Sequence, residues 1–79
     1  MDILDVKRNL NRKVWYQDFQ TLRNGAEMLL TGCIARKNPR GFLYYQAELK
    51  DLQANSRVIT GIEKIREITE GENDGIKTG

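Results

Sequence analysis

The chain has 79 residues, which fits one small domain. Its 13 basic and 11 acidic side chains give a net charge of +2, and it contains no histidine and a single cysteine. This composition excludes a disulfide within the chain, a structural zinc site and a histidine-based catalytic triad. No apolar run approaches the roughly 20 residues that span a bilayer, and no signal-peptide pattern opens the chain.

The charges are unevenly distributed. Residues 1–46 carry 8 basic and 4 acidic side chains, whereas residues 47–79 carry 5 basic and 7 acidic ones. A net charge of +2 is small for a domain that binds nucleic acid, although a local basic patch would survive the acidic second half. Residues 1–46 therefore carry a net positive charge and residues 47–79 a net negative charge.

Residues 2–10 have the pattern of a short helix. Asp2 suits the N-cap position, and two asparagines, Asn9 and Asn11, provide the stop. Apolar residues recur at the three- and four-residue spacing of one helix face. This face consists of Ile3, Val6 and Leu10.

The next segment predicts a strand and then a loop. Residues 13–17 are rich in β-formers, which indicates a short strand. Residues 18–26 follow as a loop, and Asn24-Gly25 is the strongest turn dipeptide of the chain. Two apolar side chains of this loop are expected to pack against the core: Phe19 and Leu22.

The middle of the chain predicts a β-hairpin. Residues 27–37 and 41–52 flank Asn38-Pro39-Arg40, whose composition is typical of a turn. Gly32 in the first arm indicates a bend or bulge. The second arm has a face expected toward the core, with Leu43, Tyr45, Ala47 and Leu49. Its other face, expected toward solvent, has Phe42, Tyr44, Gln46 and Glu48.

The C-terminal third predicts a turn at 54–56 and a strand at 57–61. Three isoleucines then recur every third residue, which suits one or two helical turns covering an open edge or barrel mouth. They are Ile62, Ile65 and Ile68. Residues 70–79 are rich in glycine and acidic residues, so we expect a domain over 1–69 and a disordered tail over 70–79.

Together these elements predict a mainly β domain with a short N-terminal helix. Four or five short strands, a bent second strand and a short helical turn near the C-terminus favour a small SH3-like β-barrel or a curled antiparallel sheet. The alternative is an α+β sheet with one helix packed across it.

Three segments resemble a group of small bacterial proteins. The segments are 29–37 (LLTGCIARK), 44–52 (YYQAELKDL) and 55–59 (NSRVI). They are similar to uncharacterised proteins of phages and mobile elements of Gram-positive bacteria, over residues 3–68. The resemblance implies a cytoplasmic setting and a short accessory gene, and it brings neither a catalytic motif nor a functional residue with it.

Little in the sequence points to catalysis. Cys33 is the strongest nucleophile, but no imidazole is present to activate it, and its apolar strand favours a core side chain over a low-pKa thiol near Arg36 or Lys37. Glu48 and Asp51 are spaced closely enough for Mg²⁺ or acid–base chemistry, yet two exposed carboxylates are far commoner than a site. We therefore predict a protein that is not an enzyme, with no cofactor and no metal.

Binding is the better prospect. Basic residues gather at the helix–strand junction and at the hairpin tip, with aromatic residues nearby in sequence. Such residues suit single-stranded nucleic acid, where bases stack on rings. Basic and aromatic residues are equally suited to the hot spots of protein interfaces. Alternatively, the aromatic side chains form the core of the domain. The candidate binding surface comprises Arg8, Arg12, Lys13, Trp15, Tyr16, Arg36, Lys37, Arg40 and Tyr44.

Adjacent strand residues point to opposite faces, so Trp15 and Tyr16 are not both expected in the core of a one-sided sheet. The first functional hypothesis is a small non-catalytic protein-interaction module, a phage or mobile-element accessory protein that binds or inhibits a host protein, with no membrane partner. The alternative is a small nucleic-acid-binding β-barrel that uses the basic and aromatic surface residues.

Overall fold

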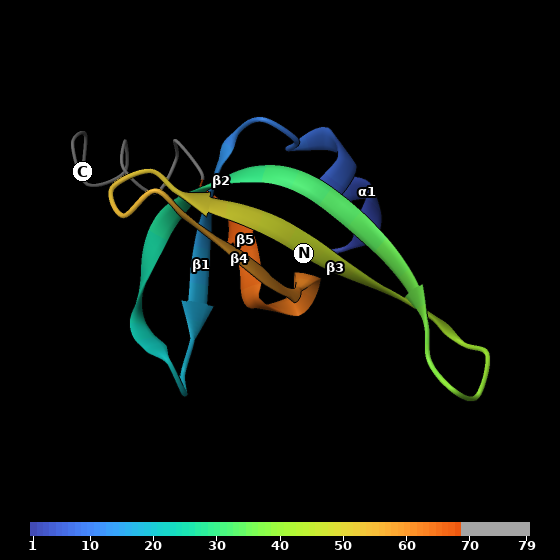
Figure 1. Cartoon of the computed structure of the whole chain (residues 1–79). Coiled ribbons are helices and arrows are strands. Elements are labelled where there is room, and N and C mark those ends of the chain that lie inside the picture. The colour runs from blue at the N-terminus through green and yellow to red at the C-terminus, as the bar shows by residue number, and fades with distance from the viewer. Residues whose placement is uncertain (69–79) are drawn as a thin grey trace, which may run out of the picture.

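The computed structural model describes residues 1–68. In this part of the chain one short helix precedes five antiparallel strands, which form a single sheet in the order β4-β3-β2-β1-β5. The sheet curls without closing, because its edge strands β4 and β5 do not pair with each other (Figure 1). The elements are α1 (Ile3–Arg8), β1 (Lys13–Asp18), β2 (Leu22–Lys37), β3 (Leu43–Asp51), β4 (Ser56–Gly61), the 3₁₀ turn η1 (Ile62–Lys64) and β5 (Ile65–Glu67). The predicted mainly β class with an N-terminal helix is confirmed.

The N-terminal helix begins as predicted and ends earlier. The Asp2 carboxylate accepts a hydrogen bond of 2.8 Å from the backbone N–H of Asp5, which caps the first turn. The helix ends at Arg8, and Asn9 is its C-cap. Leu10 therefore lies outside the helix, with 37% of its surface exposed, while Val6 is fully buried.

The predicted strand at 13–17 is confirmed as β1, but the predicted loop after it is wrong. The chain reverses at residues 19–21, where Asp18 accepts hydrogen bonds from the backbone N–H groups of Gln20 and Thr21. Asn24 and Gly25 lie within β2, at the place where the β1–β2 register shifts. Gly25 has a φ of +77°, so the Asn-Gly pair forms a bulge instead of the hairpin turn.

The β2–β3 hairpin is confirmed, and its first strand begins five residues earlier than predicted. A second register shift lies between Leu30 and Gly32, where the sequence indicates a bend. Ala47 and Leu49 of β3 are fully buried, as expected for the core face. Leu43 lies on the same face and is 60% exposed, because the hairpin extends past the rest of the sheet at that point.

The predicted strand at 57–61 is confirmed as β4, whereas the helical turns expected over 62–68 are reduced to η1. Residues 65–67 instead form β5, which pairs with β1 through Val14↔Glu67 and Tyr16↔Ile65. The free edge of β1 offers backbone hydrogen bonds that a continued helix could not use. The isoleucines spaced three residues apart therefore do not lie on one helix. Ile62 begins the 3₁₀ turn, and Ile65 begins β5.

The core lies inside the curl of the sheet. Its buried apolar residues come from α1, β1, β2, β3 and β5: Val6, Val14, Tyr16, Met28, Leu30, Ala47, Leu49 and Ile65. The Met1 amino group donates to the carbonyl oxygens of Ile62 and Ile65, both at 3.1 Å, and ties the start of α1 to η1 and β5. Within residues 1–68 the six-residue α1 falls far short of the length a membrane-spanning helix needs. The predicted tail, 70–79, lies outside the described residues.

Candidate interaction surface

The end of the β2–β3 hairpin projects beyond the rest of the sheet. The β3–β4 ladder stops at the pair Gln46↔Gly61, while the β2–β3 ladder continues for three more pairs, to Lys37↔Leu43. Residues 35–45, here called the distal hairpin, thus form a two-stranded ribbon with no third strand beside it in the described chain. Figure 1 shows this ribbon extending away from the curled body.

The tip of the distal hairpin is held by Asn38. Its side-chain oxygen accepts hydrogen bonds from the backbone N–H groups of Arg40, at 2.9 Å, and Phe42, at 3.0 Å. Its backbone N–H donates to the Phe42 carbonyl at 2.9 Å, and Gly41 supplies the positive φ of +87° that closes the turn. These contacts fix the backbone that presents the Phe42 side chain.

Three consecutive large apolar side chains of the distal hairpin are exposed. Phe42 is 66% exposed, Leu43 60% and Tyr44 43%. Because successive strand residues alternate, they place apolar surface on both sides of the ribbon. Exposed apolar residues gathered in this way mark interaction sites more often than scattered ones do.

The same ribbon is positively charged. It carries Arg36, Lys37 and Arg40, all exposed, and no acidic residue occurs between positions 28 and 47. Arg36 lies directly across the ladder from Tyr44, and its Nε donates to the Gln46 side-chain oxygen at 2.6 Å. Arg36, Tyr44 and Gln46 therefore share one face of the ribbon.

The second basic group predicted by the sequence lies elsewhere. The backbone of Asn11 and Arg12 pairs with Leu30 of β2, and β1 starts with Lys13 opposite Leu29. Six residues of extended strand separate Leu30 from Arg36, or about 20 Å. The structure therefore does not bring the two basic groups into one patch.

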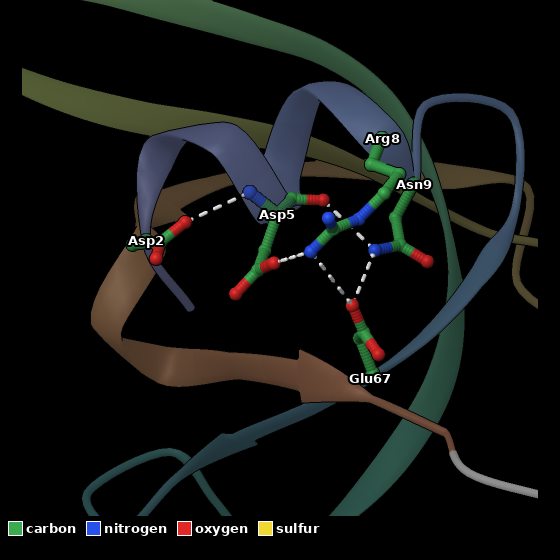
Figure 2. A network of polar contacts seen from close by, with 5 residues as sticks. All are labelled: Asp2, Asp5, Arg8, Asn9 and Glu67. Carbon is green, nitrogen blue, oxygen red and sulfur yellow. Dashed lines mark hydrogen bonds and ion pairs between the residues drawn. The ribbon is translucent and has the colours of Figure 1, made fainter.

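Arg8, the remaining member of that group, is engaged within the protein. Its guanidinium pairs with the Asp5 carboxylate and lies 3.9 Å from the Glu67 carboxylate (Figure 2). Asn9 donates from its side chain to the Glu67 carboxylate at 3.0 Å and to the Asp5 carbonyl at 2.8 Å. The network connects α1 to β5, so Arg8 is part of the scaffold, while Arg12 and Lys13 remain exposed.

Trp15 and Tyr16 point to opposite faces of β1, as predicted. Tyr16 is 6% exposed and belongs to the core, so it is not available to a partner. Trp15 is half-buried on the outer face, with the Arg66 guanidinium carbon 5.7 Å from its ring centroid. Beside it lies a shallow depression of about 140 Å³, lined by Trp15, Gln17, Phe19 and residues 63–66.

Two exposed apolar side chains, Phe19 and Leu43, differ from the sequence prediction. Phe19 was expected against the core and is 71% exposed, whereas its neighbour Leu22 packs there. Strand alternation predicts that Leu43 lies in the core. It does share a strand face with the buried Leu49, but its own side chain is exposed. The exposure of Leu43 depends on where β4 ends, and the sequence alone does not give that end point.

The residues considered for catalysis are separately engaged. Glu48 accepts from the Thr31 hydroxyl at 2.9 Å and pairs with Arg57 at 3.1 Å, and Asp51 caps the β3–β4 turn. Cys33 is half-buried and packs against the core. Within residues 1–68 no group of three or more His, Cys, Asp or Glu side chains is placed to hold a metal ion.

One ion pair beside the depression has shifted pKa values. Hydrogen bonds from the Gln20 backbone and then from Lys64 lower the pKa of Asp18. The same contact with Asp18, at 3.0 Å, raises the pKa of Lys64. The pair joins η1 to the β1–β2 turn and is a structural contact.

Compared with protein-family models, curated proteins and solved structures, the chain matches none of them.

Proposed function

We propose that this protein is a small non-catalytic interaction module whose distal hairpin docks onto a protein partner with an acidic surface. The observation that carries the proposal is the exposed run Phe42, Leu43 and Tyr44 on a projecting ribbon that bears three cations and no acid. Aromatic residues and arginine dominate protein hot spots, and complementary charge steers the encounter.

The construction of the hairpin supports the same function. A turn fixed by Asn38 and a ladder of backbone hydrogen bonds hold the apolar side chains in place before a partner arrives. Such preorganisation reduces the entropy lost on binding.

The strand order, and the 3₁₀ turn between β4 and β5, support placing the domain among small barrels of the SH3-like type. The residue resemblance of 29–37, 44–52 and 55–59 supports a role as an accessory protein of a phage or mobile element, acting in the bacterial cytoplasm on a host protein. The SH3-like classification and the accessory role are both part of the proposal.

A specific observation also favours the alternative function, nucleic-acid binding. The acid-free stretch from 28 to 47 carries Arg36, Lys37 and Arg40 on the same ribbon as the exposed Tyr44, and cations combined with exposed aromatic rings suit the binding of single strands. Against it, the second basic group lies about 20 Å away along β2. Glu48, the first acid past this stretch, lies only four residues from Tyr44. A groove that follows many phosphates is therefore not formed by these residues.

The test is site-specific photo-crosslinking in a Gram-positive bacterium. A photoreactive residue at Phe42 is expected to capture a distinct protein, and one at Leu4, which is 68% exposed on α1, is not. With the captured protein purified, Phe42→Ala and Arg40→Ala should each weaken binding by about tenfold or more. Equal capture from both positions would contradict the docking site.

A salt titration separates the alternative. Labelled single- and double-stranded DNA are titrated with the protein at about 50 and 200 mM salt, where three phosphate contacts predict a loss in affinity of about 40-fold for the duplex and about 20-fold for the single strand. We expect no measurable binding at the higher salt. Micromolar binding that Arg36→Ala and Lys37→Ala both weaken would favour the nucleic-acid function.

A further inference from the structure

A second surface, separate from the distal hairpin, lies along the free edge of β4. Within the described residues β4 pairs with β3 alone, and its backbone forms no hydrogen bond outside that ladder. Residues 56–61 therefore present a row of unpaired backbone N–H and C=O groups on the side away from β3. Such a row is a template for another strand.

This edge lacks the features with which proteins usually block strand pairing. The ladder to β3 runs without a bulge from Asp51↔Ser56 to Gln46↔Gly61, and the strand contains neither proline nor lysine. Its one charged side chain, Arg57, is paired with Glu48 of β3 at 3.1 Å. The rest is dominated by β-branched residues: Val58, Ile59 and Thr60.

The opposite edge of the sheet is a poorer template. β5 has three residues, two of them charged, and Glu67 is engaged by Asn9 of the helix end. β4 has six residues, and its central Ile59 is 52% exposed on the outer face. Covering this side chain adds an apolar contribution to the backbone hydrogen bonds.

We propose that two copies of this chain associate through β4, with the two strands antiparallel about a two-fold axis. The strand is complementary to itself. In a register centred on Val58, Arg57 lies opposite Ile59 of the second copy, and in one centred on Ile59 it lies opposite Gly61. Neither register places like charges directly opposite each other, and each keeps Val58 and Thr60 on the core side. Because the contact is isologous, assembly closes at two copies.

Analytical ultracentrifugation of the full chain under reducing conditions tests the proposal. Between about 10 µM and 1 mM the wild type is expected to reach twice its chain mass of 9.1 kDa. Ile59→Lys should weaken the dimer by about 100-fold, since each of two isoleucines is worth about tenfold. Leu4→Lys, an equal change on the exposed face of α1, should leave it unaltered.

Circular dichroism establishes that each variant is folded, and Ile59→Thr serves as a second variant that keeps the β-branch while losing apolar surface. A wild-type chain that stays monomeric over the whole range overturns the proposal. So does a dimer that persists in both Ile59 variants, or one that Phe42→Ala disrupts, since that residue lies on the distal hairpin.

Discussion

The indole ring of Trp15 lies over Gly25, so closely that a Cβ atom at position 25 would stand 2.5 Å from the indole Nε1. Gly25 also has a φ of +77°, which disfavours every L side chain. The two residues thus fix the bulge at which the β1–β2 register shifts, and the Trp15 ring covers that bulge.

Gly25→Ala should destabilise the fold by about 2–4 kcal/mol, because a positive φ and an overpacked ring contact act together. Gly41→Ala is the matched control: its φ is +87°, but nothing lies within 4 Å of the added Cβ, so about 1–2 kcal/mol is expected. Urea unfolding monitored by circular dichroism measures both. Equal losses would show that the ring contact contributes nothing.

Leu49→Ala and Leu43→Ala test how far the core extends along β3. Both side chains lie on one face of the strand, but Leu49 is fully buried and Leu43 is 60% exposed. We expect a loss of about 3–4 kcal/mol for Leu49→Ala and less than about 1 kcal/mol for Leu43→Ala. Comparable losses would mean that the distal hairpin folds back onto the core in solution.

Asn9→Ala should cost about 1–2 kcal/mol, because Asn9 is 8% exposed and its amide donates both to the end of α1 and to Glu67. Glu67→Gln keeps an acceptor for Asn9 and removes only a charge near the exposed Arg8, so its cost should stay below about 0.5 kcal/mol. Thermal unfolding of both variants checks the difference. A larger effect for Glu67→Gln would make the ion pair, not the amide, the main link between α1 and β5.

Stability should fall in acid through Asp18. Its pKa is lowered in the folded state, first by the Gln20 backbone N–H and then by Lys64, so its contribution is present above the ordinary value of 3.8 and is lost as the pH falls through the folded value. Lys64 has a raised pKa, and its contribution is lost as the pH rises past 10.5 and through the folded value.

Asp18→Asn should therefore flatten the dependence of the urea midpoint on pH at both ends. Lys64→Met should remove the alkaline part and retain much of the acid part, since the Gln20 hydrogen bond remains. An acid dependence abolished by Lys64→Met would reverse the order of the two causes.

Local features of this protein could be predicted from its sequence. Asp2 caps the helix, the turn at Asn38 joins two alternating arms, and Trp15 and Tyr16 face apart. Each depends on backbone conformation and side-chain alternation within a few neighbouring residues, which the sequence encodes directly. The three cations and exposed aromatics of the distal hairpin were likewise identifiable, because they lie together in the chain.

Other features depended on contacts between distant residues. Asn24-Gly25 forms a bulge because Trp15 covers it, residues 65–67 form a strand because β1 has a free edge, and Leu43 is exposed because β4 ends at Gly61. The separation of the two basic groups follows from the register that sets Lys13 opposite Leu29. Register and strand ends are fixed by packing between segments far apart in the sequence. Only the tertiary structure therefore decided which predicted surface residues lie together.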